Sequence, residues 1–160
     1  MKIKLGGKLD SSIVNGDGIR TVLFSTGCIH KCEGCHNSHL ADYDSGEDFS
    51  IDEILNILDK NAKVTSKRVT FSGGDPFFQA NEFAILAKKL KEKNFNIWCY
   101  TGYTIEQILN SKNKSFLELL ENIDVLVDGK FDKTLTDKAP KYAGSSNQRI
   151  INVKDYLKSK

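Results

Sequence analysis

Three of the four cysteines in this 160-residue chain lie within one short stretch. They are Cys28, Cys32 and Cys35, spaced Cys-x3-Cys-x2-Cys, so one loop can fold their thiolates around an inorganic centre. A structural zinc site normally closes with four protein ligands. A cubane iron–sulfur cluster has four irons, and three cysteines leave one of them open to another ligand. The motif therefore predicts a [4Fe–4S] cluster with one iron available for chemistry.

A zinc site is the alternative interpretation of the same cysteines. Its fourth ligand would be His30, His36 or Cys99. Cys99 lies inside a predicted strand, where a lone buried cysteine usually just fills space. His36 directly follows the last thiol and is expected near the centre whatever the metal, whereas His30 and His39 are expected at the surface. Colour separates the alternatives, because an iron–sulfur protein is brown and a zinc protein is colourless.

A buried strand is expected to deliver the cysteine loop. Residues 20–26 are β-branched and aromatic in their middle, and Gly27 then turns the chain. Ser50 and Glu53 form a capping box, which opens a helix running to about residue 62. Further patterns predict strands at 2–5, 68–71, 96–100, 124–127 and 148–153, helices at 79–93, 104–111 and 115–122, a helical turn at 154–159, and polar irregular segments at 42–48 and 132–147.

The alternation of strands and helices favours a parallel sheet with right-handed crossovers. The chain is too short for an eight-unit barrel. We therefore expect an α/β fold: an open partial (βα) barrel of about five or six mostly parallel strands, forming a single domain over residues 1–160.

Four polar or glycine-bearing segments each follow a predicted strand directly. Besides the cysteine loop, they are Gly-Gly-Asp-Pro at 73–76, Thr-Gly-Tyr-Thr at 101–104 and Asp-Gly-Lys at 128–130. In a parallel sheet these positions share the edge where α/β folds place their sites. The last three segments also have a structural interpretation, as a turn, a helix cap and a salt-bridged turn respectively.

The Gly-Gly-Asp-Pro segment suits a ligand that carries an ammonium group. Gly73 and Gly74 have no Cβ to keep a ligand away from backbone carbonyls. The carboxylate of Asp75 would favour the ammonium as a charge-assisted hydrogen bond. In the Asp-Gly-Lys segment, Asp128 and Lys130 are further candidates for cofactor binding.

Charge and hydropathy exclude several classes of protein. The net charge of +2 comes from 23 basic and 21 acidic side chains, a balance that does not suggest nucleic acid or an anionic membrane as partner. The sequence contains no apolar run of about 18 residues, and the first seven residues have no apolar signal-peptide core. Three clustered cysteines with one left over do not form a disulfide framework. We expect a cytoplasmic protein, because a reducing cytosol preserves thiolate ligands.

These motifs together resemble those of the radical S-adenosylmethionine enzymes. The cysteine spacing is similar to that superfamily's cluster motif, and residues 73–76 are similar to its second motif. Within the superfamily, the chain resembles the activating proteins of anaerobic, class III ribonucleoside-triphosphate reductases. The resemblance covers about residues 13–152 and is carried by residues 15–18, 32–37, 70–76, 100–103, 127–130 and the Gly-Ser-Ser-Asn-Gln-Arg stretch at 144–149.

The resemblance implies a reaction. The three cysteines would hold a [4Fe–4S] cluster, and S-adenosyl-L-methionine would chelate the fourth iron. Reductive cleavage of that cofactor would give a 5′-deoxyadenosyl radical, which abstracts hydrogen from a glycine of the reductase large subunit. The residues implied in cofactor binding are Gly34, Cys35, His36, Gly73, Gly74 and Asp75. Gly34 departs from the superfamily, which often has an aromatic residue at this position.

The resemblance also implies protein partners. These are the large subunit of the anaerobic ribonucleoside-triphosphate reductase and an electron donor such as flavodoxin. The irregular segment 132–149 is a candidate for part of the docking surface. Two alternatives remain: a radical enzyme that acts on another glycyl-radical enzyme or on a small molecule, and a zinc-bearing interaction module. The short chain argues against a small-molecule enzyme, because it leaves little to enclose a substrate.

Overall fold

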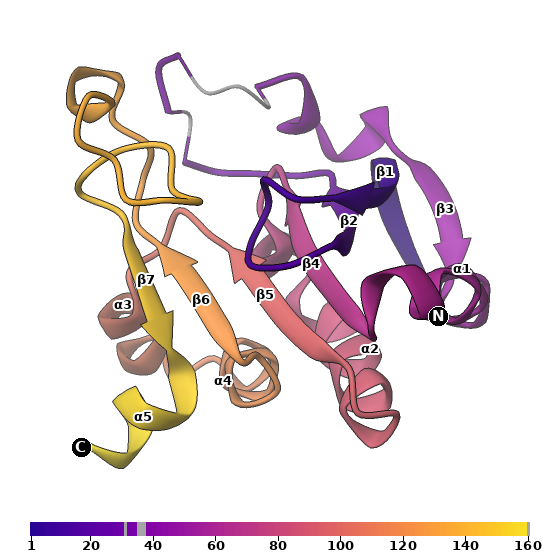
Figure 1. Ribbon diagram of the computed structural model, residues 1–160. Helices are drawn as coiled ribbons and strands as arrows, with labels where there is room; N and C mark the ends of the chain where they lie inside the picture. Colours follow the sequence, from indigo (N-terminus) through magenta and orange to yellow (C-terminus); the bar gives the residue numbers. More distant parts are fainter. Residues whose placement is uncertain (31, 35–37, 160) are drawn as a thin grey trace.

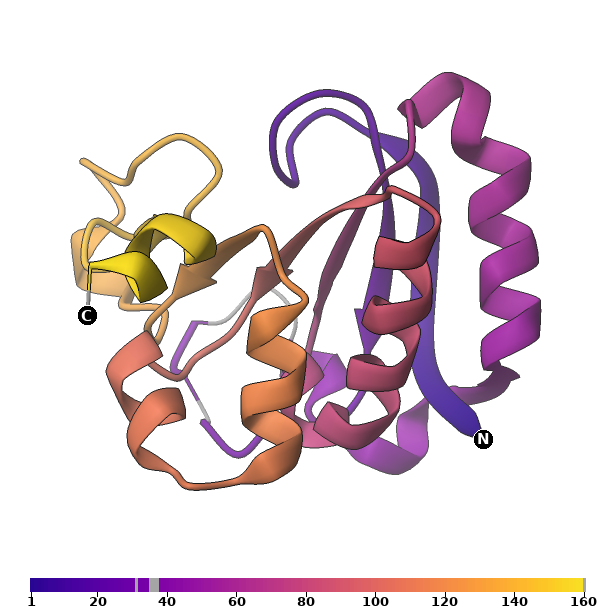
Figure 2. The ribbon, with the colours of Figure 1, turned by 90° about the horizontal axis from the view of Figure 1, so that it is seen from below.

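A computed structural model describes residues 1–30, 32–34 and 38–159 of the chain. Their strands form one sheet in the order β3-β1-β2-β4-β5-β6-β7. Figures 1 and 2 show α2, α3 and α4 on one face of this sheet, whereas long loops cross the other face. The chain therefore has an α/β architecture with a helix-covered face and a loop-covered face.

The elements follow the expected alternation of strands and helices. The strands are β1 (Lys2–Ser12), β2 (Arg20–Ser25), β3 (Glu47–Ser50), β4 (Arg68–Gly73), β5 (Asn96–Tyr100), β6 (Val125–Asp128) and β7 (Arg149–Asn152). The helices are α1 (Ile51–Thr65), α2 (Ala80–Glu92), α3 (Ile105–Asn110), α4 (Lys114–Glu121) and α5 (Val153–Lys158).

The centre of the sheet is parallel and its two edges are antiparallel. Strands β2, β4, β5 and β6 pair in parallel. This was expected, because α2 connects β4 to β5, and α3 and α4 connect β5 to β6. Strand β1 pairs antiparallel with both β2 and β3, and β7 pairs antiparallel with β6. The expected five or six strands are thus seven in the described residues, because both edges carry added antiparallel strands.

Two N-terminal strands differ from the sequence prediction. Strand β1 continues to Ser12, well beyond the predicted 2–5, with irregular pairing near Gly7 and Leu9. Strand β3 occupies part of the segment predicted as a loop at 42–48. It pairs with β1 at the sheet edge, where polar side chains are tolerated and the apolar alternation that marks a strand is weak.

Helix starts follow their capping residues. The Ser50 side chain accepts a hydrogen bond from the Glu53 backbone N–H, and Glu53 accepts one from the Ser50 N–H, which confirms the predicted capping box. Thr104 and Gln107 form the same motif at α3. In the described part of the chain, no helix is long and apolar enough to cross a membrane.

Side-chain alternation along the parallel strands separates two environments. Leu23, Phe71, Cys99 and Leu126 pair in one row across the four strands, and each is fully buried in the core beneath the helices. Cys99 therefore fills space in the core, as predicted. On each strand, the residues directly before and after this row point to the opposite face, because side chains alternate along a strand.

Candidate functional site

A pocket of about 600 Å³ lies at the carboxyl ends of the parallel strands. All four segments predicted to follow a strand contribute to it: Cys28 and Cys32, Gly73 and Gly74, Thr101 and Gly102, and Gly129. The prediction that these segments meet at one sheet edge is confirmed. The volume falls within the range of small-molecule sites in proteins.

The cysteine loop leaves β2 and forms one wall of the pocket. Cys28 and Cys32 are half-buried and line the pocket. The backbone N–H of Gly27 donates to Leu40 O at 2.9 Å, and that of Cys28 donates to Ala41 O at 3.1 Å. These bonds fix the start of the loop against the segment that returns from it. The third predicted ligand, Cys35, and its neighbour His36 lie outside the described residues.

The glycines after β4 are required by close packing of the backbone. Gly73 has a φ of +114°, and a Cβ there would lie 2.3 Å from Ser25 backbone atoms. A Cβ on Gly74 would lie 2.6 Å from Gly27 O. The glycines let β4 approach the root of the cysteine loop, and both also line the pocket. The turn and the predicted ligand role are therefore compatible at this position.

The Asp75 carboxylate is 1% exposed and bonded within the protein. Its Oδ1 accepts a hydrogen bond from the Phe77 N–H at 2.9 Å. Its Oδ2 accepts from Thr101 Oγ1 at 2.8 Å and from the Gly102 N–H at 3.0 Å, and lies 2.6 Å from His30 Nε2. Direct bonding of Asp75 to a ligand ammonium stays a prediction; the described contacts give this carboxylate a structural role as well.

His30 differs from its predicted surface position. Its side chain is 5% exposed and contacts the Tyr103 ring edge to face, with the ring centroids 4.5 Å apart. The surface prediction was wrong because loop residues are usually solvated, whereas this side chain turns inward to a carboxylate that the sequence places 45 residues away. His39 is exposed, as expected.

The zinc alternative loses Cys99 as a fourth ligand. The side chain is fully buried in the core beneath the helices, where burial raises the pKa of its thiol. Among the described residues, Cys28, His30 and Asp75 form a group whose potential ligand atoms lie within 4.8 Å of one another. Of the three described cysteines, Cys28 and Cys32 line the pocket and Cys99 does not.

Asp128 is buried at the end of β6 and ties three elements together. It accepts a hydrogen bond from the Ile105 N–H at the start of α3, at 2.8 Å. Arg149 of β7 donates to both Asp128 oxygens, at 3.0 and 2.6 Å, and to both oxygens of Glu106. The Arg149 hydrogen bonds, with a further one from Tyr156, lower the pKa of Glu106 to about 2. Cofactor binding by Asp128 remains a prediction, and its described contacts are structural.

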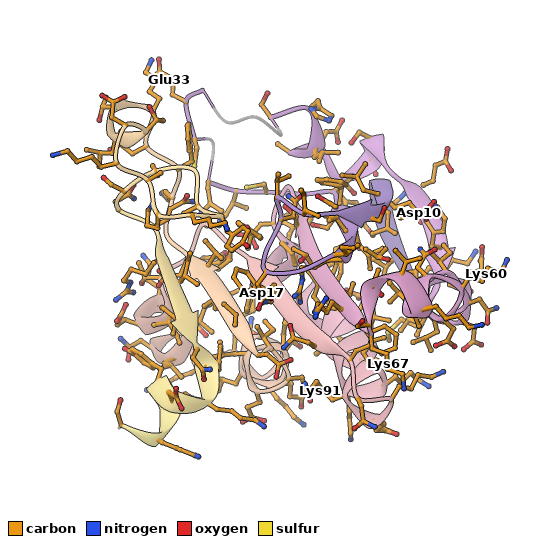
Figure 3. All side chains as sticks on the ribbon, in the orientation of Figure 1. Asp10, Asp17, Glu33, Lys60, Lys67 and Lys91 are labelled. Carbon is orange, nitrogen blue, oxygen red and sulfur yellow. The ribbon has the colours of Figure 1, made fainter. Side chains whose placement is uncertain are left out.

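Lys130 is exposed and borders a second, smaller hollow of about 350 Å³ next to the main pocket. Glu33 of the cysteine loop and Lys133 line the same hollow and form an ion pair at 2.6 Å. Figure 3 shows Glu33 at the outer end of this loop, beside the segment that follows β6. Gly34 is exposed with a φ of +75°, and a Cβ there would lie 3.4 Å from the Lys133 side chain.

The Gly-Ser-Ser-Asn-Gln-Arg stretch contributes Gly144 and Gln148 to another wall of the pocket. Gln148 Oε1 accepts hydrogen bonds from the N–H groups of Gly144 and Ser145, and its Nε2 donates to Gly129 O. The Tyr100 hydroxyl donates to Tyr142 O at 2.6 Å. These bonds hold the irregular segment after β6 against the end of the sheet.

The connection between β1 and β2 closes the base of the loop-covered face. Arg20 is fully buried and donates to Asp17, to Thr70 Oγ1 and to Asn96, while its guanidinium lies 5.4 Å from the Trp98 ring centroid. Burial lowers the pKa of Arg20 to about 10, which still leaves it charged at neutral pH. The connection is thereby fixed on the sheet.

Several lining residues were missed from the sequence. Phe24 and Tyr100 lie on predicted strands, and the alternation of side chains along a strand could have assigned them to the pocket face. Tyr142, Asn15 and His30 come from loops, where no local pattern predicts the direction of a side chain.

The described residues fit an iron–sulfur cluster with an adjacent small-molecule ligand. Thiolates are the usual ligands of such clusters, and the thiols of Cys28 and Cys32 face a pocket larger than a single ion needs. The backbone of Gly73 and Gly74 lines the same pocket. The donor set and the pocket therefore fit a cofactor of this kind.

Comparison with known families defines the class of protein. A family model described as a 4Fe-4S single cluster domain matches residues 14–151. The match includes the cysteine loop and every segment that lines the pocket. The structure is also similar to the crystal structure of QueE from Escherichia coli, with a TM-score of 0.52 and 15% identity over 65% of this chain and 54% of that chain. This last likeness shows the fold alone.

Relatives of similar sequence identify the family within this class. The chain is 38% identical to the anaerobic ribonucleoside-triphosphate reductase-activating protein of Enterobacteria phage T4, over 86% of each chain. It is 37% identical to that of Vibrio cholerae, over 86% of this chain and 90% of the relative, and 34% identical to that of Escherichia coli K12, over 89% and 94%. The chain belongs to the family of anaerobic ribonucleoside-triphosphate reductase-activating proteins.

Proposed function

We propose that this chain is a radical S-adenosylmethionine activase that places a glycyl radical on the large subunit of an anaerobic ribonucleoside-triphosphate reductase. The observation that carries the proposal is the pocket in which the cysteine loop faces the Gly-Gly-Asp-Pro turn, in a chain of this family. Two half-buried thiols and the backbone of two glycines thus line one site.

Cys28 and Cys32, with Cys35, would hold the [4Fe–4S] cluster. The backbone at Gly73 and Gly74 would orient the methionyl group of S-adenosylmethionine, and Gly34 and His36 would lie near its adenosyl group. When bound, the cluster and the cofactor together supply a carbon-centred radical able to remove hydrogen from a glycine Cα.

The buried carboxylate of Asp75 provides electrostatic support for a cationic group. Within the described residues, its hydrogen-bond partners are three neutral donors and His30, so no lysine or arginine neutralises it. A negative charge in a poorly solvated site attracts an ammonium group over several ångströms. Asp75 would therefore favour the methionyl ammonium beside Gly73 and Gly74, even without direct contact.

The fold suits a substrate that is part of another protein. We propose that the sheet forms an open partial barrel, whose loop-covered face admits a glycine-bearing loop of the reductase. The irregular segment 132–149 forms one wall of the pocket and would contribute to docking. A reducing cytosol suits the thiolates, and a small electron carrier such as flavodoxin would reduce the cluster.

Magnetic resonance of the assembled reaction tests the function. Anaerobically reconstituted and reduced protein is mixed with S-adenosylmethionine and the reductase large subunit. We expect a doublet from a carbon-centred radical on the large subunit, which collapses when its glycines carry deuterium at Cα. Cleavage of S-adenosylmethionine without a radical on the partner would reject the activase and favour a radical enzyme with another substrate.

A further inference from the structure

The side chain of His30 is an anchor within the cysteine loop. His30 lies midway between Cys28 and Cys32, yet its side chain is only 5% exposed whereas its neighbour Ile29 is 60% exposed. The loop therefore turns one side chain inward and leaves the preceding one in solvent. An inward side chain between two thiols restricts where both can lie.

The partner of His30 comes from the Gly-Gly-Asp-Pro segment. Nε2 of His30 lies 2.6 Å from Asp75 Oδ2, a short hydrogen bond to a carboxylate. The same oxygen accepts from Thr101 Oγ1 and from the Gly102 N–H, and the other oxygen accepts from the Phe77 N–H. One buried carboxylate thus joins the cysteine loop, the end of β5 and the turn after β4.

The absence of a side chain at Gly102 makes room for the imidazole. A Cβ at this position would lie 2.4 Å from Cδ2 and 2.8 Å from Nε2 of His30. The ring of Tyr103 closes another side, at 80° to the imidazole plane. The recess is therefore shaped for a planar ring that donates a hydrogen bond to Asp75.

We infer that His30 is a positioning residue for the cluster: through the bond from Nε2 to Asp75 it fixes Cys28 and Cys32 in place and couples the cysteine loop to the cofactor-binding turn. Cys28 Sγ lies within 4.8 Å of a ring nitrogen of His30 and of an Asp75 oxygen. Removal of the imidazole therefore changes the immediate surroundings of this thiol. Fixed contacts around a metal site orient its ligands, and here the contact acts on the thiols through the backbone of the cysteine loop. The inference rests on the cluster and not on the identity of the protein partner.

Four substitutions separate the hydrogen bond from mere space filling. His30→Gln can place its amide N–H near the position of Nε2, whereas His30→Asn is too short to reach and His30→Leu has no donor. His39→Leu is the matched control, because His39 is an exposed histidine on the return of the same loop. Each variant is reconstituted anaerobically, and circular dichroism verifies that it is folded.

Two readouts then report on the cluster itself. The first is the rate at which a chelator removes iron, followed by the loss of visible absorption. The second is the paramagnetic resonance spectrum of the reduced cluster, with and without S-adenosylmethionine. For His30→Leu and His30→Asn we expect iron loss about 10-fold faster than in the parent and a changed cluster spectrum. His30→Gln and His39→Leu should stay within about twofold of the parent, since they keep the donor or lie outside the network.

Parent-like iron loss and spectra in both His30→Leu and His30→Asn would overturn the inference. So would a His30→Gln variant as labile as His30→Leu, because the hydrogen bond would then not be the operative contact. If His30→Leu does not fold, the comparison of Gln with Asn decides alone. Failure of the parent to assemble a cluster would instead reject the proposed function.

Discussion

Asp75 follows β4 and Asp128 ends β6 in the same sheet, and both are buried, yet they stabilise different regions. Asp128 is paired with Arg149, a permanent cation, and holds β7 and the start of α3 to the sheet. Asp75 has three neutral donors and His30 around it, and holds the cysteine loop to the ends of β4 and β5. One aspartate therefore stabilises the edge of the sheet, and the other stabilises the walls of the pocket.

The two carboxylates differ in how strongly each can still attract a cationic ligand. The charge of Asp128 is neutralised by a bidentate guanidinium, which in turn pairs with Glu106. Such a network contributes to stability and has little remaining attraction for a ligand. The charge of Asp75 has no lysine or arginine among its described partners, so it remains available to a cationic ligand. Substitutions around Asp128 should therefore affect stability, and substitution of Asp75 should affect the binding of the cofactor.

The largest effect is expected at the cysteines. Cys28→Ala and Cys32→Ala should each abolish the functional cluster, and Cys35→Ala should do the same if the spacing motif is the ligand set. Cys99→Ala should keep the cluster and lower the free energy of unfolding by about 1–2 kcal/mol, because it leaves a small cavity in the core. Iron and sulfide content after anaerobic reconstitution is the measurement. A Cys99→Ala variant that loses iron as fully as Cys32→Ala would refute the three-cysteine ligand set.

Arg149→Ala tests the sheet-edge network. It leaves Asp128 buried without its cation, which we expect to lower the free energy of unfolding by about 2–3 kcal/mol, less than for a fully buried pair because Arg149 is 46% exposed. Denaturant unfolding measures this loss. Cluster assembly in the folded protein should be unchanged. A variant with normal stability and a lost cluster would reverse the proposed division between the two aspartates.

Asp75→Asn removes the charge beside the Gly73–Gly74 turn. We expect S-adenosylmethionine to bind more than about tenfold more weakly, because a charge-assisted interaction is worth about 1.5–3 kcal/mol. The cluster should still assemble, since asparagine retains an oxygen that can accept a hydrogen bond from His30. Titration of the cofactor into reconstituted variant and parent measures the affinity. Equal affinities would leave Asp75 with its positioning role only.

The smallest effect concerns the pH dependence of stability. Hydrogen bonds from Arg149 and Tyr156 lower the pKa of Glu106 from 4.5 to about 2. The stabilisation from this carboxylate is therefore present above pH 4.5 and is lost as the pH falls toward 2. Glu106→Gln should flatten that part of the stability profile, by less than about 1 kcal/mol because the pair is half-exposed. Denaturant midpoints of the cluster-free protein at several pH values test this, and identical profiles would contradict it.

The sequence predicted the parallel centre of the sheet well, because its strands and helices have clear periodicities and caps such as Ser50 with Glu53. It also placed the four strand-end segments at one edge, since parallel topology forces their carboxyl ends together. The inward turn of His30 and the wall formed by residues 142–148 could not be predicted. Both depend on hydrogen bonds between distant segments, which leave no periodic signal in the chain.

The extension of β1 was also hidden from sequence reasoning. Its outer half, including the glycine pair Gly6 and Gly7, has low strand propensity, and pairing with β2 overrides that preference. Asp75 and Asp128 show the same limit at the level of side chains. Their positions after strands were predictable, whereas the identity of their partners required the structure.

Three thiolates would leave one iron of the cluster to S-adenosylmethionine, at the pocket between the cysteine loop and the Gly73–Gly74 turn. Electron–nuclear double resonance of the reduced, reconstituted protein tests this arrangement, with the cofactor carrying nitrogen-15 in its amino group. We predict a hyperfine coupling between that nitrogen and the cluster, which disappears when unlabelled cofactor replaces the labelled one. A cluster that binds no labelled nitrogen, or a reconstituted protein that holds zinc instead of iron, would contradict the claim.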